Sequence, residues 1–267
     1  MELIRLTPFS LALTAVLVLL LALLSYRLHL GVGRRLIIAA LRSTVQLLLL
    51  GMVLTILFDQ RNPWLIGLIT LIMLSVASHE VTARQKHRYA GGWGYGIGAA
   101  SMLLSSFSVT LLTLLVIIRV EPWYTPQYLI PLLGMLLGNT MSGVALSLDN
   151  LSRAAWGKKG EIEARLMLGA EFGEAIREIR RDALRSGLIP IINSMSVAGV
   201  VSLPGMMTGQ ILGGSPPFEA AKYQILILLL IAFGTGLGSI FAVYAGSARL
   251  FDERQRLRLD RLNSSAD

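Results

Sequence analysis

The chain has 267 residues, of which 54% are hydrophobic and only 15% are charged, and its mean hydropathy is +0.65. A soluble domain of average composition carries about 25% charged residues, so this composition indicates an all-α polytopic membrane protein and leaves little chain for a soluble domain. The net charge of +8 does not indicate nucleic-acid binding, because the basic residues lie in short loops between apolar segments, and the absence of cysteine excludes disulfides and thiolate metal sites.

Seven apolar segments are long enough to cross a bilayer, which takes about 20 helical residues each. They cover residues 7–26, 36–58, 63–83, 97–118, 127–148, 188–212 and 221–246. Nineteen of the 24 Lys and Arg residues fall in one set of connections, and the other set holds only Arg5, Arg61, Arg119 and Lys222. Because basic loops stay in the cytoplasm, this asymmetry predicts an external N-terminus and a cytoplasmic C-terminus. We expect a single transmembrane domain over residues 1–267.

The second and third segments each carry a charged residue. Arg42 shares a helix face with Gln46, and an arginine at membrane depth costs at least about 2.5 kcal/mol, so it is expected either to face the bundle interior or to extend to the cytoplasmic surface. Glu80, near a cytoplasmic span end, is expected to form an interfacial polar pair, to pair with Arg42 or to attract a cation. His79 and Glu80 begin an HExxH-like sequence, but Ala83 replaces the second histidine, so the zinc-protease motif is absent.

Small residues in the fifth and seventh segments predict close helix packing. The small-xxx-small spacing, which lets two membrane helices approach closely, occurs at Gly134, Gly138, Gly234 and Gly238. Asn139 and Thr140 follow and place hydrogen-bonding groups at mid-depth, where they need partners in neighbouring helices.

Residues 149–187 form the only sizeable polar connection. From Glu161 to Arg185, apolar residues recur at three- and four-residue steps, which predicts one amphipathic helix with a charged opposite face. Such a helix either lies on the lipid surface or packs against a cytoplasmic partner. Eight basic and seven acidic residues across the segment favour a protein partner, because an anionic-lipid anchor would be more one-sidedly basic. The basic tail, residues 247–267, is expected to be solvated.

The segment 188–212 is apolar enough to enter a membrane, yet it is poorly suited to a continuous helix. Pro190 and Pro204 each remove a backbone donor, and in lipid a broken backbone is tolerated only where it is buried in protein or lines a cavity. It is expected to be either a kinked packing helix or part of a transport pathway. A methionine pair there suits a soft ion but also fills apolar gaps. The candidate pathway residues of this segment are Asn193, Ser194, Met195, Met206, Met207 and Gln210.

No sequence motif indicates catalysis. The chain contains neither a Walker A pattern nor a GxSxG elbow, so we expect a transport protein rather than an enzyme. If it transports against a gradient, an ion gradient or a partner must supply the energy. The scarcity of membrane carboxylates argues against proton coupling, and the amphipathic helix argues for a partner.

Three runs of sequence resemble the FetB family of ABC transporter permeases, which includes bacterial iron-export proteins and plant aluminium-tolerance proteins. The runs are LLGNTMSGVALSLDN (residues 136–150), EARLMLGAEFGEAIREIRRDAL (residues 163–184) and NSMSVAGVVSLPGMMTGQILGG (residues 193–214). The resemblance covers nearly the whole chain. The second run is also similar to the start of the EAAxxxG coupling loop of other ABC permeases, although Arg165 replaces the second alanine.

The resemblance implies a multi-pass permease subunit in the cell membrane, assembled as two copies with two copies of a cytoplasmic ATP-binding subunit. That partner would use ATP and Mg²⁺, and this chain would bind no cofactor itself. The implied substrate is iron or a related metal ion with unknown ligands; the alternatives are a sugar nucleotide such as UDP-glucose, or a partner-free channel or scaffold. From the residues themselves, the candidate pathway also includes Asn139, Thr140, Arg42 and Glu80. The implied coupling residues are Gly169, Glu171, Phe172, Gly173 and Ile176.

Overall fold

A computed structural model describes residues 7–60 and 62–264; Arg5, Arg61 and the last three tail residues lie outside this range. Within it, six helical segments are long and apolar enough to cross a membrane: Phe9–Arg27, Gly33–Phe58, Pro63–Ala83, Trp93–Ile117, Pro126–Gly157 and Pro217–Arg249. The predicted all-α polytopic fold is confirmed. The orientation of the spans across the membrane stays a prediction.

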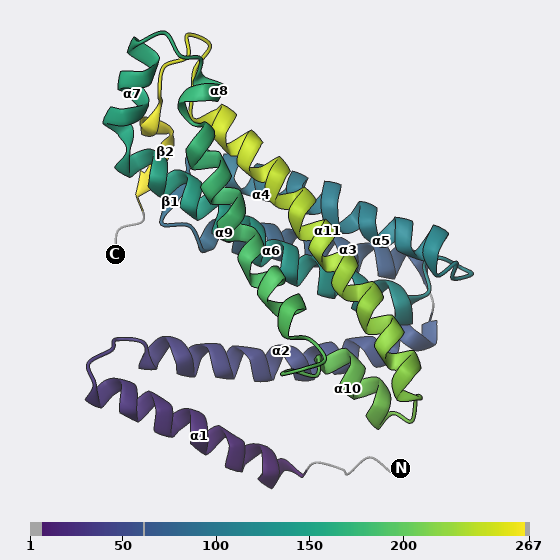
Figure 1. The fold of residues 1–267 in the computed structure, drawn as a ribbon. Coiled ribbons are helices and arrows are strands. Elements are labelled where there is room, and N and C mark those ends of the chain that lie inside the picture. The colour runs from purple at the N-terminus through teal and green to yellow at the C-terminus, as the bar shows by residue number, and fades with distance from the viewer. Residues whose placement is uncertain (1–6, 61, 265–267) are drawn as a thin grey trace. The chain divides into compact units, whose positions relative to one another are not determined.

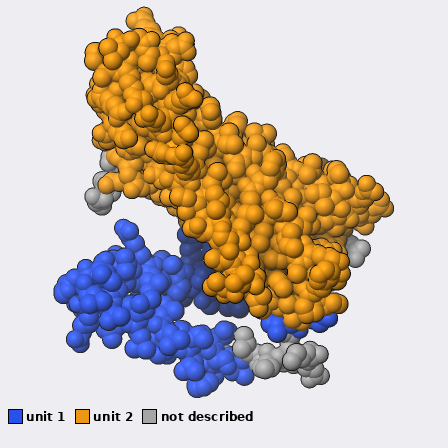
Figure 2. All heavy atoms as spheres, in the orientation of Figure 1, with its two compact units in different colours: residues 1–62, 212–214 blue, residues 63–211, 215–267 orange. Residues whose placement is uncertain are grey.

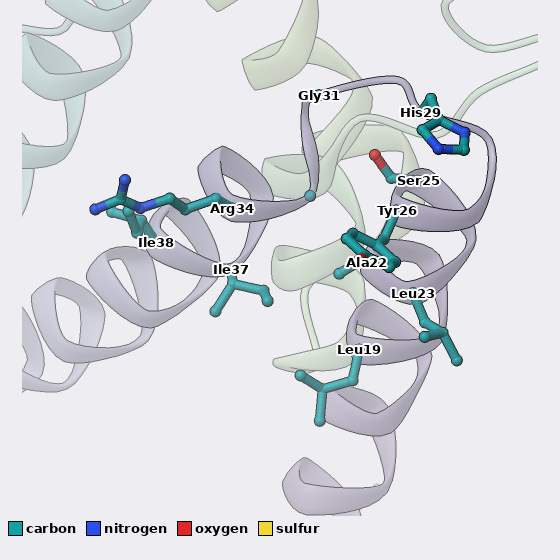
Figure 3. Close-up of a pocket in the computed structure, with 11 residues that line it drawn as sticks. Leu19, Ala22, Leu23, Ser25, Tyr26, His29, Gly31, Arg34, Ile37 and Ile38 are labelled. Atoms are coloured by element: carbon teal, nitrogen blue, oxygen red, sulfur yellow. The ribbon is translucent and has the colours of Figure 1, made fainter.

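The chain divides into two compact units, which Figure 2 colours separately. The first comprises residues 1–62 and 212–214, and its main feature is a hairpin of α1 (Pro8–Arg27) and α2 (Gly33–Gln60). Gly31, with a φ of +69°, permits the turn between them. Most side chains of the hairpin are exposed and apolar, as in helices that face lipid or other membrane helices. An open cleft of about 990 Å³ between α1 and α2 is lined by Leu19, Ala22, Tyr26 and Ile37, while Arg34 extends away along α2 (Figure 3).

The second unit, residues 63–211 and 215–267, is built around α6 (Pro126–Gly157). This helix packs against α3 (Pro63–Ala83), α9 (Arg177–Val197) and α11 (Pro217–Arg249), which Figure 1 shows running alongside it. The fourth span alternates α-helix and π-helix, as α4 (Trp93–Met102), η1 (Leu103–Phe107), α5 (Ser108–Leu112) and η2 (Thr113–Ile117). Its buried hydroxyls of Ser101, Ser105, Thr110 and Thr113 donate to carbonyls four residues earlier, whereas the buried Ser106 hydroxyl has no hydrogen-bond partner.

Small residues let α11 approach its neighbours closely. Gly234, Gly238, Ala242 and Gly246 recur at four-residue steps on this helix. A Cβ added at Gly238 would lie 2.7 Å from Thr140 Cγ2 and 2.9 Å from Ser105 Oγ, which confirms the close approach predicted at this position. A Cβ added at Gly246 would lie 2.7 Å from the Tyr89 hydroxyl oxygen.

The close approach on α6 lies further along the helix than predicted. A Cβ at Gly143 would overlap Thr235 of α11, and a Cβ at Gly187 of α9 would overlap Ser147 of α6. An added Cβ at Gly138 would meet no atom of this chain within 4 Å, so Gly138 makes no close helix contact within the second unit. An added Cβ at Gly134 would lie 3.3 Å from Met73 Cε of α3. We call the crossing of α6, α9 and α11 at Gly143 and Gly187 the three-helix seam.

The expected sixth span, residues 188–212, is broken as predicted, and it is not among the six long apolar helices. α9 continues through Pro190 and ends at Val197, and α10 (Gly205–Leu212) begins after Pro204. Between them lies a tight turn in which Gly199 has a φ of +82° and its N–H donates to the Ser202 carbonyl oxygen. The break therefore follows Gly199 and Pro204, and Pro190 is accommodated inside a helix.

The predicted continuous helix from Glu161 to Arg185 is wrong. α7 (Lys159–Met167) ends at a turn where Gly169 has a φ of +89°, which reverses the chain into the short α8 (Phe172–Ala175) and then α9. The apolar periodicity of the sequence continues through Gly169 and so gave no sign of a break. Glycine readily adopts the left-handed conformation seen there, and this conformation ends α7.

The tail is folded rather than solvated, contrary to expectation. After α11, residues 250–258 turn back, η3 (Leu259–Arg261) follows, and β2 (Leu262–Ser264) pairs antiparallel with β1 (His87–Tyr89). Leu250, Phe251 and Leu262 are buried in the same core as Tyr89. Apolar residues spaced among the tail's arginines made this packing possible.

Gly238→Val is expected to lower the stability of the detergent-solubilised protein by about 1–3 kcal/mol, because the new side chain overpacks the contact with Thr140 and Ser105. Gly236→Val on the same helix is the matched control, since the atom nearest to its added Cβ is 3.9 Å away. Thermal unfolding of both variants measures the effect. Equal midpoints would contradict a close helix contact at Gly238.

Candidate functional site

The break between α9 and α10 places two of the predicted pathway residues at a cavity of about 290 Å³ in the second unit. Met206 and Gln210 reach it from α10. Met135 of α6 lines the same cavity, together with residues from the end of the fourth span and the start of α11. The complete lining is Leu114, Ile118, Gln127, Tyr128, Pro131, Leu132, Met135, Met206, Gln210, Tyr223, Leu226 and Ile227.

The lining of this cavity is uncharged but has several polar groups. The Gln210 Oε1 atom is buried and has no hydrogen-bond partner in the structure, which leaves an acceptor available to a ligand. Pro131 lies inside α6 and has no N–H, so the Gln127 carbonyl oxygen lacks its helical donor. Two thioethers, two amides and two phenols therefore line the cavity, and this set can bind a soft ion or a neutral polar group.

The structure separates the remaining candidate pathway residues from this cavity. Asn193, Ser194 and Met195 are exposed on the last turns of α9, and the half-buried Met207 does not line the cavity. Asn139 is exposed and donates to the Met135 carbonyl oxygen at 2.8 Å. Its neighbour Thr140 faces the other way, fully buried against Gly234 and Gly238 of α11, so the two do not share one surface.

The two charged candidates occupy different settings. Arg42 is exposed on α2, within the first unit. Glu80 pairs with Arg84 at 3.3 Å, and Arg84 Nη1 donates to Ser142 Oγ of α6 at 3.4 Å. Glu80 therefore forms a polar pair, with Arg84 four residues later as its partner. Among residues 7–60 and 62–264, no group of three or more His, Cys, Asp or Glu side chains is arranged to hold a metal ion.

A second candidate surface lies at the predicted cytoplasmic end, on the loop that joins α7 to α8. Met167 and Leu168 form its tip, and they are 83% and 89% exposed. Large apolar side chains this exposed on a polar connection commonly mark a docking surface. An open groove of about 840 Å³ runs beside the tip, between this loop and residues 254–258 of the tail.

The predicted coupling residues lie in this region but at different depths. Gly169 and Glu171 line the groove, and Glu171 is exposed. The ring of the half-buried Phe172 packs on Phe251 with centroids 5.3 Å apart. The carbonyl of Gly173 accepts a short hydrogen bond from Arg180. Ile176 is fully buried, so it supports the loop from within and does not face a docked partner.

Sequence reasoning missed three residues that the structure brings forward. Met135 is not among the predicted site residues, because nothing local in the sequence places it at the same cavity as Met206. Met167 and Leu168 were read as part of an amphipathic helix. The glycine two residues before Glu171 was the signal for the turn that exposes them.

Residues 8–251 match the model of a protein family described as "Uncharacterised protein family (UPF0014)". The chain is 40% identical over 220 residues to the UPF0014 membrane protein slr1647 of Synechocystis, covering 81% of this chain and 83% of that one. It is 34% identical over 243 residues to Protein ALUMINUM SENSITIVE 3 of Arabidopsis thaliana, covering 91% and 87%. It is 30% identical over 265 residues to "Probable iron export permease protein FetB" of Escherichia coli, covering 97% of each. No solved structure matches the chain.

Met135→Cys and Met206→Cys are expected to react with methyl methanethiosulfonate at least about tenfold faster than Met102→Cys, because thiol reactivity follows access. Met102 is fully buried outside the cavity, and the natural chain has no cysteine, so each variant carries a single thiol. Intact-protein mass spectrometry over time measures the rate. Equal rates at all three positions would show that the cavity is closed to small molecules.

Proposed function

This chain belongs to the UPF0014 family of multi-pass membrane proteins, and from that membership and its cytoplasmic loop we propose that it is the transmembrane subunit of an ATP-driven exporter. Its energy would come from a separate cytoplasmic ATPase, and its substrate would be iron or a related metal ion. The relative from Escherichia coli, which is named a probable iron export permease, supports this substrate class.

The observation that carries the proposal is the apolar tip at Met167 and Leu168. Leaving two large apolar side chains in water is unfavourable by about 1.5–3 kcal/mol for each, so their burial in a partner would stabilise a complex. The tip is held between α7 and α8 and continues into α9, which runs back into the bundle. A partner that moves the tip would therefore act directly on a membrane helix.

In this proposal, ATP hydrolysis comes from another chain. No Walker A pattern is present, and no other nucleotide-binding signature replaces it. Of the relatives compared above, one is named a membrane protein and another a permease, which supports a transport role. In this proposal ATP and Mg²⁺ bind the partner subunit.

A polar strip on α3 and α6 supports two copies of this chain in the transporter. Asn139 and Ser142 are exposed on α6 near mid-depth of the expected span, and Ser142 contacts the Glu80–Arg84 pair. Polar groups that face lipid are unfavourable, whereas a second copy would supply hydrogen-bond partners. The strip therefore suits an interface between two copies related by a two-fold axis, the commonest symmetry of homo-oligomers.

The cavity chemistry favours a metal ion over a sugar nucleotide. Its lining has no cationic side chain to balance two phosphates, whereas its thioether and amide groups are neutral ligands. Such a ligand set suits Fe²⁺ or a softer ion better than Fe³⁺, which prefers anionic oxygen ligands. If basic residues elsewhere in the chain were found to bind phosphate, a sugar nucleotide would be the favoured substrate.

The test of the proposed function is recovery of the tagged full chain from gently solubilised native membranes. A P-loop ATPase in equal amount, with ATP hydrolysis stimulated by Fe²⁺ and not by UDP-glucose, is the expected result. If UDP-glucose stimulates ATP hydrolysis instead, the substrate is a sugar nucleotide. If only a homo-oligomer is recovered, with no ATPase even after crosslinking, the chain is a channel or scaffold and not an ABC permease.

Leu168→Asp is expected to reduce the recovered ATPase by about tenfold or more, because a carboxylate buried without a partner at an interface costs more than 1.4 kcal/mol. The exposed position leaves the fold unaffected, and the isosteric change Leu168→Met should retain binding. Quantitative immunoblots of the recovered complexes measure the loss. If the Leu168→Asp variant recovers as much ATPase as the wild-type chain, the tip is not part of the interface.

A further inference from the structure

The tail after α11 forms a well-defined hairpin, residues 250–258, which we call the C-terminal hairpin. Phe251 and Leu257 pair across it, and the Arg258 N–H donates to the Leu250 carbonyl oxygen at 2.7 Å. Asp252 Oδ1 accepts from the backbone N–H groups of Arg254 and Arg256 at 3.0 and 2.9 Å. The hydrogen bonds from Arg256 hold the pKa of Asp252 below its usual range, so the carboxylate is ionised and closes the turn at cytoplasmic pH.

The hairpin is fixed to the bundle at its base. The Arg261 guanidinium donates to the carbonyl oxygens of Arg249 and Phe251 at 2.9 and 3.0 Å. Beyond it, Leu262–Ser264 pairs with His87–Tyr89 of the loop that joins α3 to α4. Because both ends are held, the hairpin presents its tip at a defined place beside α8.

The hairpin tip contacts the loop that carries the exposed apolar pair. The Phe172 N–H, at the start of α8, donates to Gln255 Oε1 at 3.0 Å. Gln255 has a φ of +57°, a conformation that a non-glycine residue adopts only at some cost. With the Phe172–Phe251 ring contact, this hydrogen bond positions the loop against the hairpin.

The groove between loop and hairpin has walls of opposite charge. Glu163 and Glu171 lie on the loop side, and Arg254, Arg256 and Arg258 lie on the hairpin side. Asp252 pairs with Arg256, and Asp260 pairs with Arg258. Within residues 7–60 and 62–264, the side chains of Arg254 and Glu171 form no ion pair, so each presents a free charge beside the apolar tip.

We propose that the C-terminal hairpin is the second half of the docking site for the cytoplasmic ATPase, and that Gln255 is the residue that positions the loop. The inference rests on the proposed function. The partner surface it fits has an apolar socket for Met167 and Leu168, a carboxylate opposite Arg254 and a cation opposite Glu171. Both signs of charge in one groove fit a protein better than an anionic membrane surface, which would favour a uniformly basic groove.

The test compares Arg254→Glu with Arg181→Glu in the full chain, recovered from native membranes as above. Arg181 is exposed on α9, outside the groove, and undergoes the same change of charge. Arg254→Glu should lower the recovered ATPase at least about tenfold and weaken the salt dependence of binding, while Arg181→Glu should leave both unchanged. Thermal unfolding should be equal for the two variants.

Gln255 is tested separately by hydrogen exchange at the Phe172 amide. Gln255→Ala should raise its exchange rate several-fold, and Gln255→Glu, which keeps an acceptor oxygen, should restore protection. Gln255→Ala should also reduce ATPase recovery. Unchanged exchange would overturn the positioning role.

The outcomes distinguish the two proposals. If Leu168→Asp abolishes recovery while Arg254→Glu does not change it, the permease function stands and the hairpin is not part of the docking site. If the wild-type chain recovers no ATPase, the proposed function fails, and this inference fails with it.

Discussion

The structure depends on direct contact between the backbones of α6 and α9, against which α11 packs through small side chains. At the three-helix seam, Gly143 and Gly187 leave no room for even one added carbon, and the neighbours are the small polar side chains of Ser147, Thr235 and Ser239. Lipid chains are as apolar as leucine, so the hydrophobic effect does not hold membrane helices together, and close packing must do so. The three hydroxyls are buried without hydrogen-bond partners in the structure, a cost that the packing of the three helices offsets.

The seam also determines how the two ends of the second unit are linked. α6 and α9 cross at the seam and both continue toward the loop that joins α7 to α8, so the apolar tip is built on two helices that are locked together. α9 then ends at the Gly199 turn, beyond which α10 lines the cavity. A rigid element with a turn at its far end is the kind of arrangement that converts a movement at one site into a change at another.

Charge and polarity are divided between these ends for a physical reason. In the membrane, polar groups must be buried or line a cavity, so the break after α9 places uncharged amides and thioethers there. In the aqueous end, charged groups cost little, so arginines and carboxylates gather around the apolar tip and can give an interface its orientation. The same chain therefore carries a neutral cavity at one end and a charged groove at the other.

The sequence by itself determined the all-α membrane fold, the apolar segments and the break near Pro204, because each membrane helix must satisfy its own backbone and so leaves a local signature. It also identified Gly238 as a contact and Met206 and Gln210 as candidates for a site. It did not determine that Gly143 rather than Gly138 meets α11, since that depends on how α6 is rotated about its axis by its neighbours. The presence of Met135 and Met206 at one cavity, the hydrogen bond of Gln255 to the loop and the folded tail were decided only by tertiary structure. Each joins residues far apart in the chain, and such contacts depend on shape complementarity between distant segments, which no local pattern records.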